Sequence, residues 1–270
     1  MEFLLNSGHS LPMLGLGVYK ITDQQEMDQA VRWAWEAGYR LFDTAQMYGN
    51  EALLGNALAR LNAIREDYFV TSKLEPSNSA DPASAVRRSL RDLKMDYVDL
   101  YLIHWPGQQK ERLRRVWREL EALQQEGLIR SLGVSNCTVK HLEWILEDCQ
   151  IPPAVHQVEH HPLLHEAELY DFCRTHKIQL QAWAPLIRGN LDHPSLLAMA
   201  QRYGKSAAQI LLRWNIQQQF SVVPKSVHKE RILQNADIFD FRLSQEDVGL
   251  LNAMHIGHRT GKDPLTYDYE

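Results

Sequence analysis

FVTSK at residues 69–73 and LYLIH at residues 100–104 are two short apolar runs, and each ends in a reactive side chain. Lys73 and His104, the last residues of the two runs, are 31 positions apart. Two strands separated by a segment whose apolar residues recur at helical spacing are typical of a βα unit in a parallel sheet. This pair of runs therefore predicts a parallel α/β fold whose strands end in polar residues.

Runs of this kind recur at similar spacing along the chain. Together they predict eight strands: 15–18, 40–43, 69–73, 100–104, 129–135, 156–159, 179–183 and 221–225. Eight units in 270 residues leave about 34 residues for each, which suits a (β/α)8 barrel. We therefore predict an α/β protein in which residues 1–270 form a single-domain (β/α)8 TIM barrel. Residues 2–13, with a turn-forming Asn-Ser-Gly centre, predict an N-terminal β-hairpin that caps the bottom of the barrel.

The segment between the first two strands predicts a helix. Met27, Ala30, Val31 and Ala34 form an apolar stripe at helical spacing. Thr22 and Gln25 have the spacing of a capping box, and Gly38 stands where a helix C-terminal cap is expected.

Composition excludes several classes of protein. With 44% hydrophobic residues, the chain has the means to build a large core and is neither disordered nor collagen-like. Its net charge of -5 offers no general attraction for nucleic acid or anionic lipid. Three cysteines without CxxC spacing indicate reduced thiols. Because neither a leader pattern at MEFLLNSGHS nor a run of ~20 apolar residues is found, we expect a cytoplasmic protein without nucleic-acid or membrane partners.

Polar side chains end nearly all of the predicted strands. They are Asp43, Lys73, His104, Ser135 with Asn136, Gln157, Trp183 and Lys225. In a (β/α)8 barrel the C-terminal ends of the strands meet at one mouth, where the active site is built. We therefore expect these side chains to converge there.

Tyr48, five residues after Asp43, supplies an acid for this mouth. A tyrosine hydroxyl has a reference pKa near 10, and a neighbouring ammonium lowers it; Lys73 is the candidate. Asp43 would keep Lys73 charged, and His104 would help Tyr48 polarise a carbonyl. Such a set suits protonation of a developing alkoxide, which is half of a carbonyl reduction.

The other half of a reduction needs a hydride donor, which no side chain provides. The segment from Gly15 to Lys20 lacks the third glycine of the dinucleotide fingerprint, so a Rossmann domain is not expected. Barrels instead bind phosphate in the loops after their last strands. There, Lys225, Ser226 and Arg231 offer cationic and hydroxyl groups to a phosphomonoester.

These residues together resemble a known family. DTAQMYGNE (43–51), VTSK (70–73), LIHWP (102–106), GVSN (133–136) and PKS (224–226) are similar to motifs of the aldo-keto reductase superfamily over nearly the whole chain. The tryptophan at position 183 makes the chain resemble the bacterial 2,5-diketo-gluconate reductase and methylglyoxal reductase-like branch of that superfamily. The resemblance implies an NADPH-dependent oxidoreductase on a TIM barrel, reducing small aldehydes, dicarbonyls or keto-sugar acids to alcohols.

The resemblance also implies roles for particular residues. The catalytic tetrad would be Asp43, Tyr48, Lys73 and His104, with Tyr48 as proton donor. At the nicotinamide end, the cofactor residues would be Ser135, Asn136 and Gln157 on the carboxamide and Trp183 on the ring. At the other end, Lys225, Ser226, Val227 and Arg231 would lie at the 2′-phosphate, and Asn235 would contact the adenine. The substrate would contact Tyr19, Met47 and Trp105. Gln234 stands where a glutamate is common in the family, and His228 stands where some relatives have an arginine.

Two other functions fit the same strand ends. In a class I aldolase, Lys73 would form a Schiff base with a carbonyl substrate. In a non-catalytic, cofactor-sensing barrel, the same residues would bind the cofactor without catalysing a reaction. His160, His161 and His165 suggest a zinc site, which needs three or four ligands in a defined geometry. The family that the chain resembles has a His-Pro pair at the position of His161 and Pro162 without a metal, so the resemblance implies no metal here. We expect a monomer with a small-molecule carbonyl substrate.

Overall fold

A computed structural model describes residues 1–268, and eight parallel strands form its central sheet. The strands are β3 (Gly15–Gly17), β4 (Leu41–Asp43), β5 (Phe69–Leu74), β6 (Val98–Ile103), β7 (Ile129–Ser135), β8 (Val155–Glu159), β9 (Gln179–Trp183) and β10 (Ser221–Val222). Each pairs with the next in chain order, and bridges from Leu14 to Val222 and from Gly17 to Lys225 close the sheet. The predicted barrel is confirmed. Residues 269–270, the end of the chain, lie outside the described residues.

The last strand is shorter than the sequence predicts. β10 ends at Val222, whereas the apolar run predicted a strand to Lys225. Pro224 has no backbone N–H to donate to a neighbouring strand, so regular pairing stops before it.

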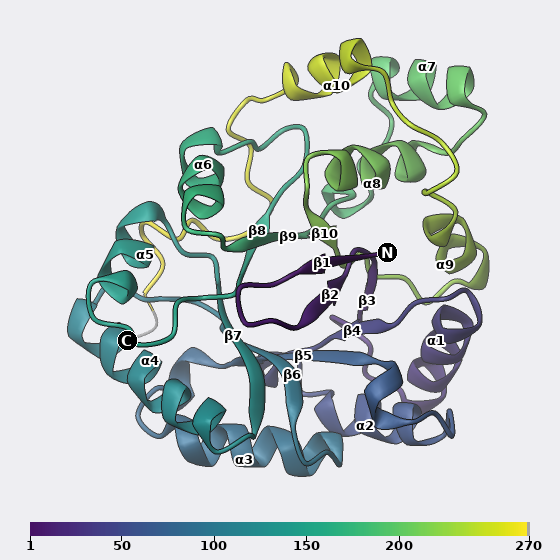
Figure 1. The fold of residues 1–270 in the computed structure, drawn as a ribbon. Coiled ribbons are helices and arrows are strands. Elements are labelled where there is room, and N and C mark those ends of the chain that lie inside the picture. Colours follow the sequence, from purple (N-terminus) through teal and green to yellow (C-terminus); the bar gives the residue numbers. More distant parts are fainter. Residues whose placement is uncertain (269–270) are drawn as a thin grey trace.

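Helices surround the barrel, as Figure 1 shows. They are α1 (Gln24–Glu36), α2 (Glu51–Ala59), α3 (Pro82–Leu93), α4 (Lys110–Gln125), α5 (Val139–Leu146), α6 (Ala167–Thr175), α7 (Pro194–Tyr203), α8 (Ala207–Gln217), α9 (Lys229–Ala236) and α10 (Gln245–Asn252). Among the described residues, no helix combines the length and the apolar character needed to cross a membrane.

Helix α1 confirms one part of its prediction and corrects another. Its apolar stripe is buried, and Gly38 has the positive φ of +89° typical of a residue that follows a helix. The N-cap, however, is Asp23 and not Thr22: the Asp23 carboxylate accepts from the Glu26 backbone N–H at 2.9 Å. A carboxylate also interacts favourably with the positive end of the helix dipole, which a threonine hydroxyl does less well.

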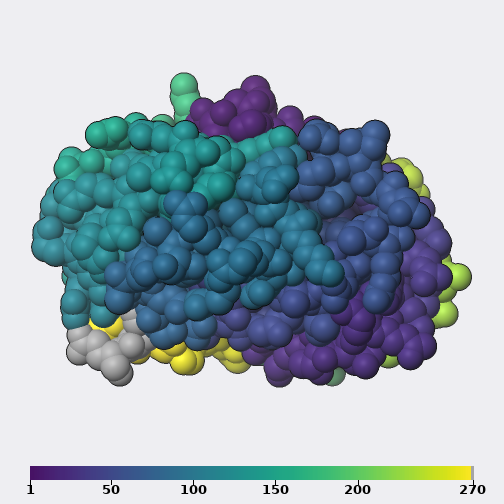
Figure 2. Space-filling view, turned by 90° about the horizontal axis from the view of Figure 1, so that it is seen from below, coloured from purple at the N-terminus to yellow at the C-terminus, as the bar shows by residue number. Residues whose placement is uncertain are grey.

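The predicted N-terminal hairpin is present. β1 (Glu2–Leu4) and β2 (Ser10–Pro12) pair antiparallel, and Figure 1 shows them in front of the ring of strands. Leu5 and Leu11 are buried in a cluster with Leu41 and Phe69 from the barrel strands. In Figure 2 the hairpin protrudes at one end, and the yellow C-terminal segment lies at the opposite edge. The hairpin therefore closes the end of the barrel away from the C-terminal segment.

The polarity of the barrel interior rises along the strands. Alternate residues of a barrel strand point inward. On β5 these are Phe69, Thr71 and Lys73, all buried. On β4, Leu41 joins the apolar cluster around the hairpin and Asp43 lies in the polar upper part. The interior is thus apolar near the hairpin and polar at the strand C-termini.

Candidate active site

Lys73 is the centre of the polar end. Its side chain is completely buried. Its ammonium donates to Asp43 Oδ1 at 2.6 Å, to the Thr44 carbonyl at 2.8 Å and to the Tyr48 hydroxyl at 3.4 Å. An ammonium has three donors and no acceptor, so these three bonds use its full capacity. Burial lowers the pKa of Lys73, but the charge and hydrogen bond of Asp43, together with the contribution of Tyr48, outweigh burial and leave the pKa raised. Lys73 is therefore a fixed cation.

Tyr48 ends a short 3₁₀ turn, η1 (Gln46–Tyr48), that follows β4. Its ring packs between Tyr19, at a centroid distance of 4.9 Å, and His104, at 5.6 Å. Since Lys73 can only donate, the phenol oxygen accepts from it, and the phenol hydrogen is left to point elsewhere. The predicted convergence of Asp43, Lys73, Tyr48 and His104 is therefore present.

The electrostatics of Tyr48 differ from the sequence prediction. We predicted that Lys73 lowers the Tyr48 pKa. Lys73 does act in that direction, but burial is the larger effect and raises the pKa of Tyr48. Tyr48 is accordingly a neutral phenol across the physiological pH range, with the ammonium ready to stabilise a phenolate.

His104 follows β6 and is buried. Burial, and then the charge of Lys73, lower the pKa of His104 well below its ordinary value. The imidazole is therefore neutral and carries one N–H donor. Its Nδ1 has no hydrogen-bond partner among the described residues.

The residues predicted for the carboxamide lie together on adjacent strands. Ser135 and Gln157 are register partners on β7 and β8, and the Gln157 amide nitrogen donates to Asp43 Oδ2 at 2.7 Å. Asn136 has a left-handed backbone with φ of +57°, which turns the chain at the end of β7. Its side-chain oxygen accepts from the Trp183 indole at 2.8 Å. Asn136 also donates to the His104 carbonyl at 3.0 Å, so this group is joined to the tetrad.

The predicted phosphate loop starts at the same end of the barrel. The backbone of Lys225 forms a parallel β-bridge with that of Gly17, and Gly17 is in turn the register partner of Asp43. Lys225 and Arg231 are exposed, and neither has a carboxylate partner among the described residues. The Ser226 hydroxyl is buried and accepts from the His228 backbone N–H at 3.1 Å, just before α9. Val227 is half-buried, and Asn235 is buried on α9.

The predicted substrate residues occupy the rim of this site. Tyr19 and Met47 are 46% and 43% exposed, although both are large and mostly apolar. Trp105, after His104, is buried against Tyr267 of the C-terminal segment at a centroid distance of 4.8 Å. Tyr267 was not identified from the sequence.

Glu159, at the end of β8, is a buried residue that sequence reasoning missed. It accepts from the Thr260 backbone N–H at 2.6 Å, the Thr260 hydroxyl at 2.5 Å and the Gly261 N–H at 3.2 Å. Burial would raise the pKa of Glu159, but hydrogen bonds from His161 and Thr260 outweigh it and lower the pKa. A Cβ on Gly261 would come within 2.4 Å of the Trp183 ring. Glu159 therefore anchors the C-terminal segment against the predicted cofactor residue. Its position at a strand end was the available signal.

The histidines set aside in the sequence have structural partners. His160 stacks between Phe220 and Trp214, at centroid distances of 3.8 and 4.6 Å, and His161 contacts Glu159. Within residues 1–268, no group of three or more His, Cys, Asp or Glu side chains is arranged to hold a metal ion.

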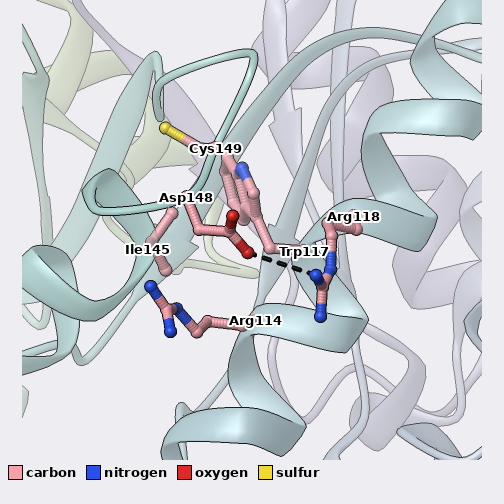
Figure 3. Close-up of a pocket in the computed structure, with 6 residues that line it drawn as sticks. All are labelled: Arg114, Trp117, Arg118, Ile145, Asp148 and Cys149. Carbon is pink, nitrogen blue, oxygen red and sulfur yellow. Dashed lines mark ion pairs between the residues drawn. The ribbon is translucent and has the colours of Figure 1, made fainter.

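An indentation on the outer wall is distinct from this site. Figure 3 shows its lining residues, which come from α4, from α5 and from the turn after α5: Arg114, Trp117, Arg118, Ile145, Asp148 and Cys149. It is too narrow to admit a water molecule, and Arg118 pairs with Asp148 across it at 3.2 Å. Burial raises the pKa of the Cys149 thiol. The side chains predicted to be catalytic, Asp43, Tyr48, Lys73 and His104, do not line this indentation.

Comparisons with known proteins agree with this geometry. Residues 13–256 match the model of the Aldo/keto reductase family. The chain is 44% identical to glyoxal reductase of Bacillus subtilis (strain 168), over 96% of this chain and 95% of that protein. It is 41% identical to methylglyoxal reductase DkgA of Yersinia pestis, over 97% and 96%. A crystal structure of a Bombyx mori aldo-keto reductase in complex with NADP superposes with a TM-score of 0.92 at 33% identity, covering 99% of this chain and 97% of that one. This chain therefore belongs to the aldo/keto reductase family.

Proposed function

We propose that this protein reduces small aldehydes and dicarbonyl compounds to alcohols with NADPH, with Tyr48 as the proton donor. The observation that carries the proposal is the buried Lys73 ammonium, held by Asp43 and donating to the Tyr48 hydroxyl. That bond leaves the phenol hydrogen to the substrate and a cation beside the oxygen that becomes negative. Family membership and the glyoxal and methylglyoxal reductase relatives support the same reaction class.

The residues present suit NADPH. Lys225 and Arg231 are exposed cations without carboxylate partners in the described part of the chain, as a 2′-phosphate requires. Gln157 Oε1 has no hydrogen-bond partner among residues 1–268, so it can accept from a carboxamide. The half-buried Trp183 ring offers a stacking surface. Ser135, Asn136 and Gln157 would hold the nicotinamide end, and Lys225, Ser226, Val227, Arg231 and Asn235 the adenosine end.

The side chains of the site then have separate tasks. NADPH, held by these residues, would supply the hydride that the carbonyl carbon receives. The neutral His104 orients the carbonyl oxygen by a hydrogen bond, and Tyr48 delivers its proton to that oxygen as negative charge develops. Lys73 stabilises the resulting phenolate, and Asp43 keeps Lys73 charged and in place. Solvent returns a proton to Tyr48 after the alcohol leaves.

The rim supports small substrates. Tyr19, Met47 and Trp105 give the mouth apolar and aromatic walls, which are usual in small-molecule sites. The C-terminal segment, anchored by Glu159 and packed on Trp105 through Tyr267, limits the space above the strand ends. The names of the relatives, glyoxal reductase and methylglyoxal reductase, favour the same class of small substrate.

The test is the loss of NADPH absorbance, and separately of NADH absorbance, with methylglyoxal, aromatic aldehydes and keto-sugar acids. We expect oxidation of NADPH that depends on the carbonyl compound. If neither cofactor is oxidised or bound, the proposal is wrong. Trapping a substrate on Lys73 with borohydride would then favour the aldolase, and binding of NADPH without any turnover would favour the cofactor-sensing barrel.

We also propose that the protein is a cytoplasmic monomer of one domain. The three free thiols, Cys137, Cys149 and Cys173, support a reducing compartment. Gel filtration coupled to light scattering should give the mass of one 31.3 kDa chain; twice that mass would contradict the monomer.

A further inference from the structure

A buried row of polar side chains crosses the barrel below the proposed cofactor site. Ser135, Gln157, Gln181 and Ser221 are successive register partners on β7, β8, β9 and β10. Each is at most 2% exposed. The interior of a barrel of this kind is normally filled by branched apolar residues, so a polar row here requires an explanation.

Three side chains of the row form one continuous chain of hydrogen bonds. Gln157 Nε2 donates to Asp43 Oδ2 at 2.7 Å and to Gln181 Oε1 at 2.7 Å. Gln181 Nε2 donates to the Ser221 hydroxyl at 3.1 Å. The Ser221 hydroxyl donates in turn to the Pro12 carbonyl at 2.8 Å, in the N-terminal hairpin.

The two ends of this chain fix its direction. Both the Asp43 carboxylate and the Pro12 carbonyl can only accept hydrogen bonds. From the Pro12 end, Ser221 must donate, so Gln181 must turn its NH₂ to Ser221 and its carbonyl oxygen to Gln157. From the Asp43 end, Gln157 must present its NH₂. Both ends therefore require the same orientation of the Gln157 amide.

We infer that Gln181 is a positioning residue for cofactor binding: with Ser221, it locks the Gln157 amide so that only Oε1 faces the nicotinamide end. Both N–H groups of Gln157 are used inside the protein, so Gln157 offers an acceptor and no donor. That polarity suits the NH₂ of a carboxamide and disfavours the amide's flipped orientation. The inference rests on the proposed function, because it concerns the nicotinamide half of NADPH.

The experiment compares two ligands by calorimetry: NADP⁺, and 2′-phospho-ADP-ribose, which lacks the nicotinamide. In Gln181→Met the acceptor for Gln157 is lost at similar side-chain size. We expect about tenfold weaker binding of NADP⁺, or about 1.4 kcal/mol, and binding of 2′-phospho-ADP-ribose within twofold of the wild type. Gln179→Met is the matched control on the same strand, because Gln179 bonds only to backbone carbonyls near the surface, and it should change neither.

A double-mutant cycle shows whether Gln181 acts through Gln157. In a Gln157→Met background, Gln181→Met should cause no further loss of NADP⁺ binding. Should Gln181→Met fail to fold, Ser221→Ala removes the far end of the chain more gently, and we expect about threefold weaker NADP⁺ binding with 2′-phospho-ADP-ribose unchanged.

The outcomes separate this inference from the proposed function. Equal weakening of both ligands, or unchanged NADP⁺ binding in a folded variant, would show that Gln181 is only structural and would overturn the inference alone. A wild-type protein that binds neither ligand would overturn the proposed function together with the inference.

Discussion

The two ends of the barrel interior are built from different chemistry. At the hairpin end, Leu5, Leu11, Leu41 and Phe69 pack in an apolar cluster. Two residues further along β4, and four further along β5, the inward positions are Asp43 and Lys73, which form a fully buried ion pair.

This difference separates stability from reactivity. Burial of apolar area stabilises the fold, at roughly 25 cal/mol per Å². A buried ion pair contributes little net stability, since desolvation of both charges offsets their attraction. The hairpin end therefore holds the barrel closed. The polar end keeps the Lys73 cation beside the acid Tyr48, at some cost in the stability of the fold.

The largest effect is expected when the cation at the polar end is removed. Lys73→Met should lower turnover at least a hundredfold, a usual range for loss of acid catalysis. It should also destabilise the fold by about 3 kcal/mol, because Asp43 is left charged and buried. Steady-state rates and urea unfolding measure the two effects.

The double variant Lys73→Met/Asp43→Asn sharpens the comparison. Removing the remaining charge should recover most of the lost stability and none of the activity. If activity returned with stability, the two ends would not differ in the way described.

At the hairpin end we expect the opposite separation. Leu11→Ala should lower the free energy of unfolding by about 3 kcal/mol, because it leaves a cavity in the apolar cluster. The turnover of the folded protein should stay within twofold of the wild type. Leu4→Ala is the control: Leu4 is 77% exposed, so its loss should cost less than about 0.5 kcal/mol. A hundredfold loss of turnover in Leu11→Ala would break the comparison.

A change of pH should alter the stability of the fold through the titrating groups and not through the apolar end of the barrel. Burial lowers the pKa of His104 well below its ordinary value and lowers those of His156 and His160 to about 3. Below pH 6.5 the unfolded chain takes up protons that the folded protein does not. Stability should therefore fall, by about 2 kcal/mol for each of His156 and His160 between pH 6.5 and 5.

The basic limb has the opposite sign. The pKa of Lys73 is raised when folded, so its contribution is complete below pH 10.5 and is lost as the pH rises through the folded value. Urea midpoints should be highest between these limits. His104→Gln should reduce the loss on the acid side, and an unchanged loss would contradict a neutral, buried His104.

The smallest effect is expected at the exposed phosphate loop. Arg231→Ala should weaken NADPH binding about tenfold and NADH binding less than twofold, since only NADPH carries the 2′-phosphate. Arg87→Ala, at an exposed arginine on α3 that pairs with Glu126, is the control and should change neither. Equal losses for both cofactors would mean that Arg231 does not contact the 2′-phosphate.

Much of this architecture followed from the sequence because a barrel brings its strand ends together. The eight strands were predicted from apolar runs, and Asp43, Lys73 and His104 were found as the last residues of three of those runs. Tyr48 was found because it follows Asp43 by five residues, in a loop next to the barrel mouth. Assignment of their roles stays a prediction until the variants are measured.

What the sequence did not show depends on packing between distant segments. Glu159 is paired with Thr260, 101 positions away, and Gln181 lies inside a strand where an apolar residue is usual. The direction of the Tyr48 pKa shift depends on the depth of burial, which neighbouring residues in the chain do not determine. The N-cap of α1 differed by one residue because Thr22 and Asp23 are both good caps.

The central claim is that Tyr48 acts on the substrate and not on the cofactor. Its most direct test is to measure both kcat and the NADPH dissociation constant for Tyr48→Phe, beside Tyr68→Phe, which alters a tyrosine packed on Trp35 and Phe42 away from Lys73. The account predicts that kcat falls at least a hundredfold in Tyr48→Phe with NADPH binding within twofold, while Tyr68→Phe changes neither. Full turnover in Tyr48→Phe would contradict it.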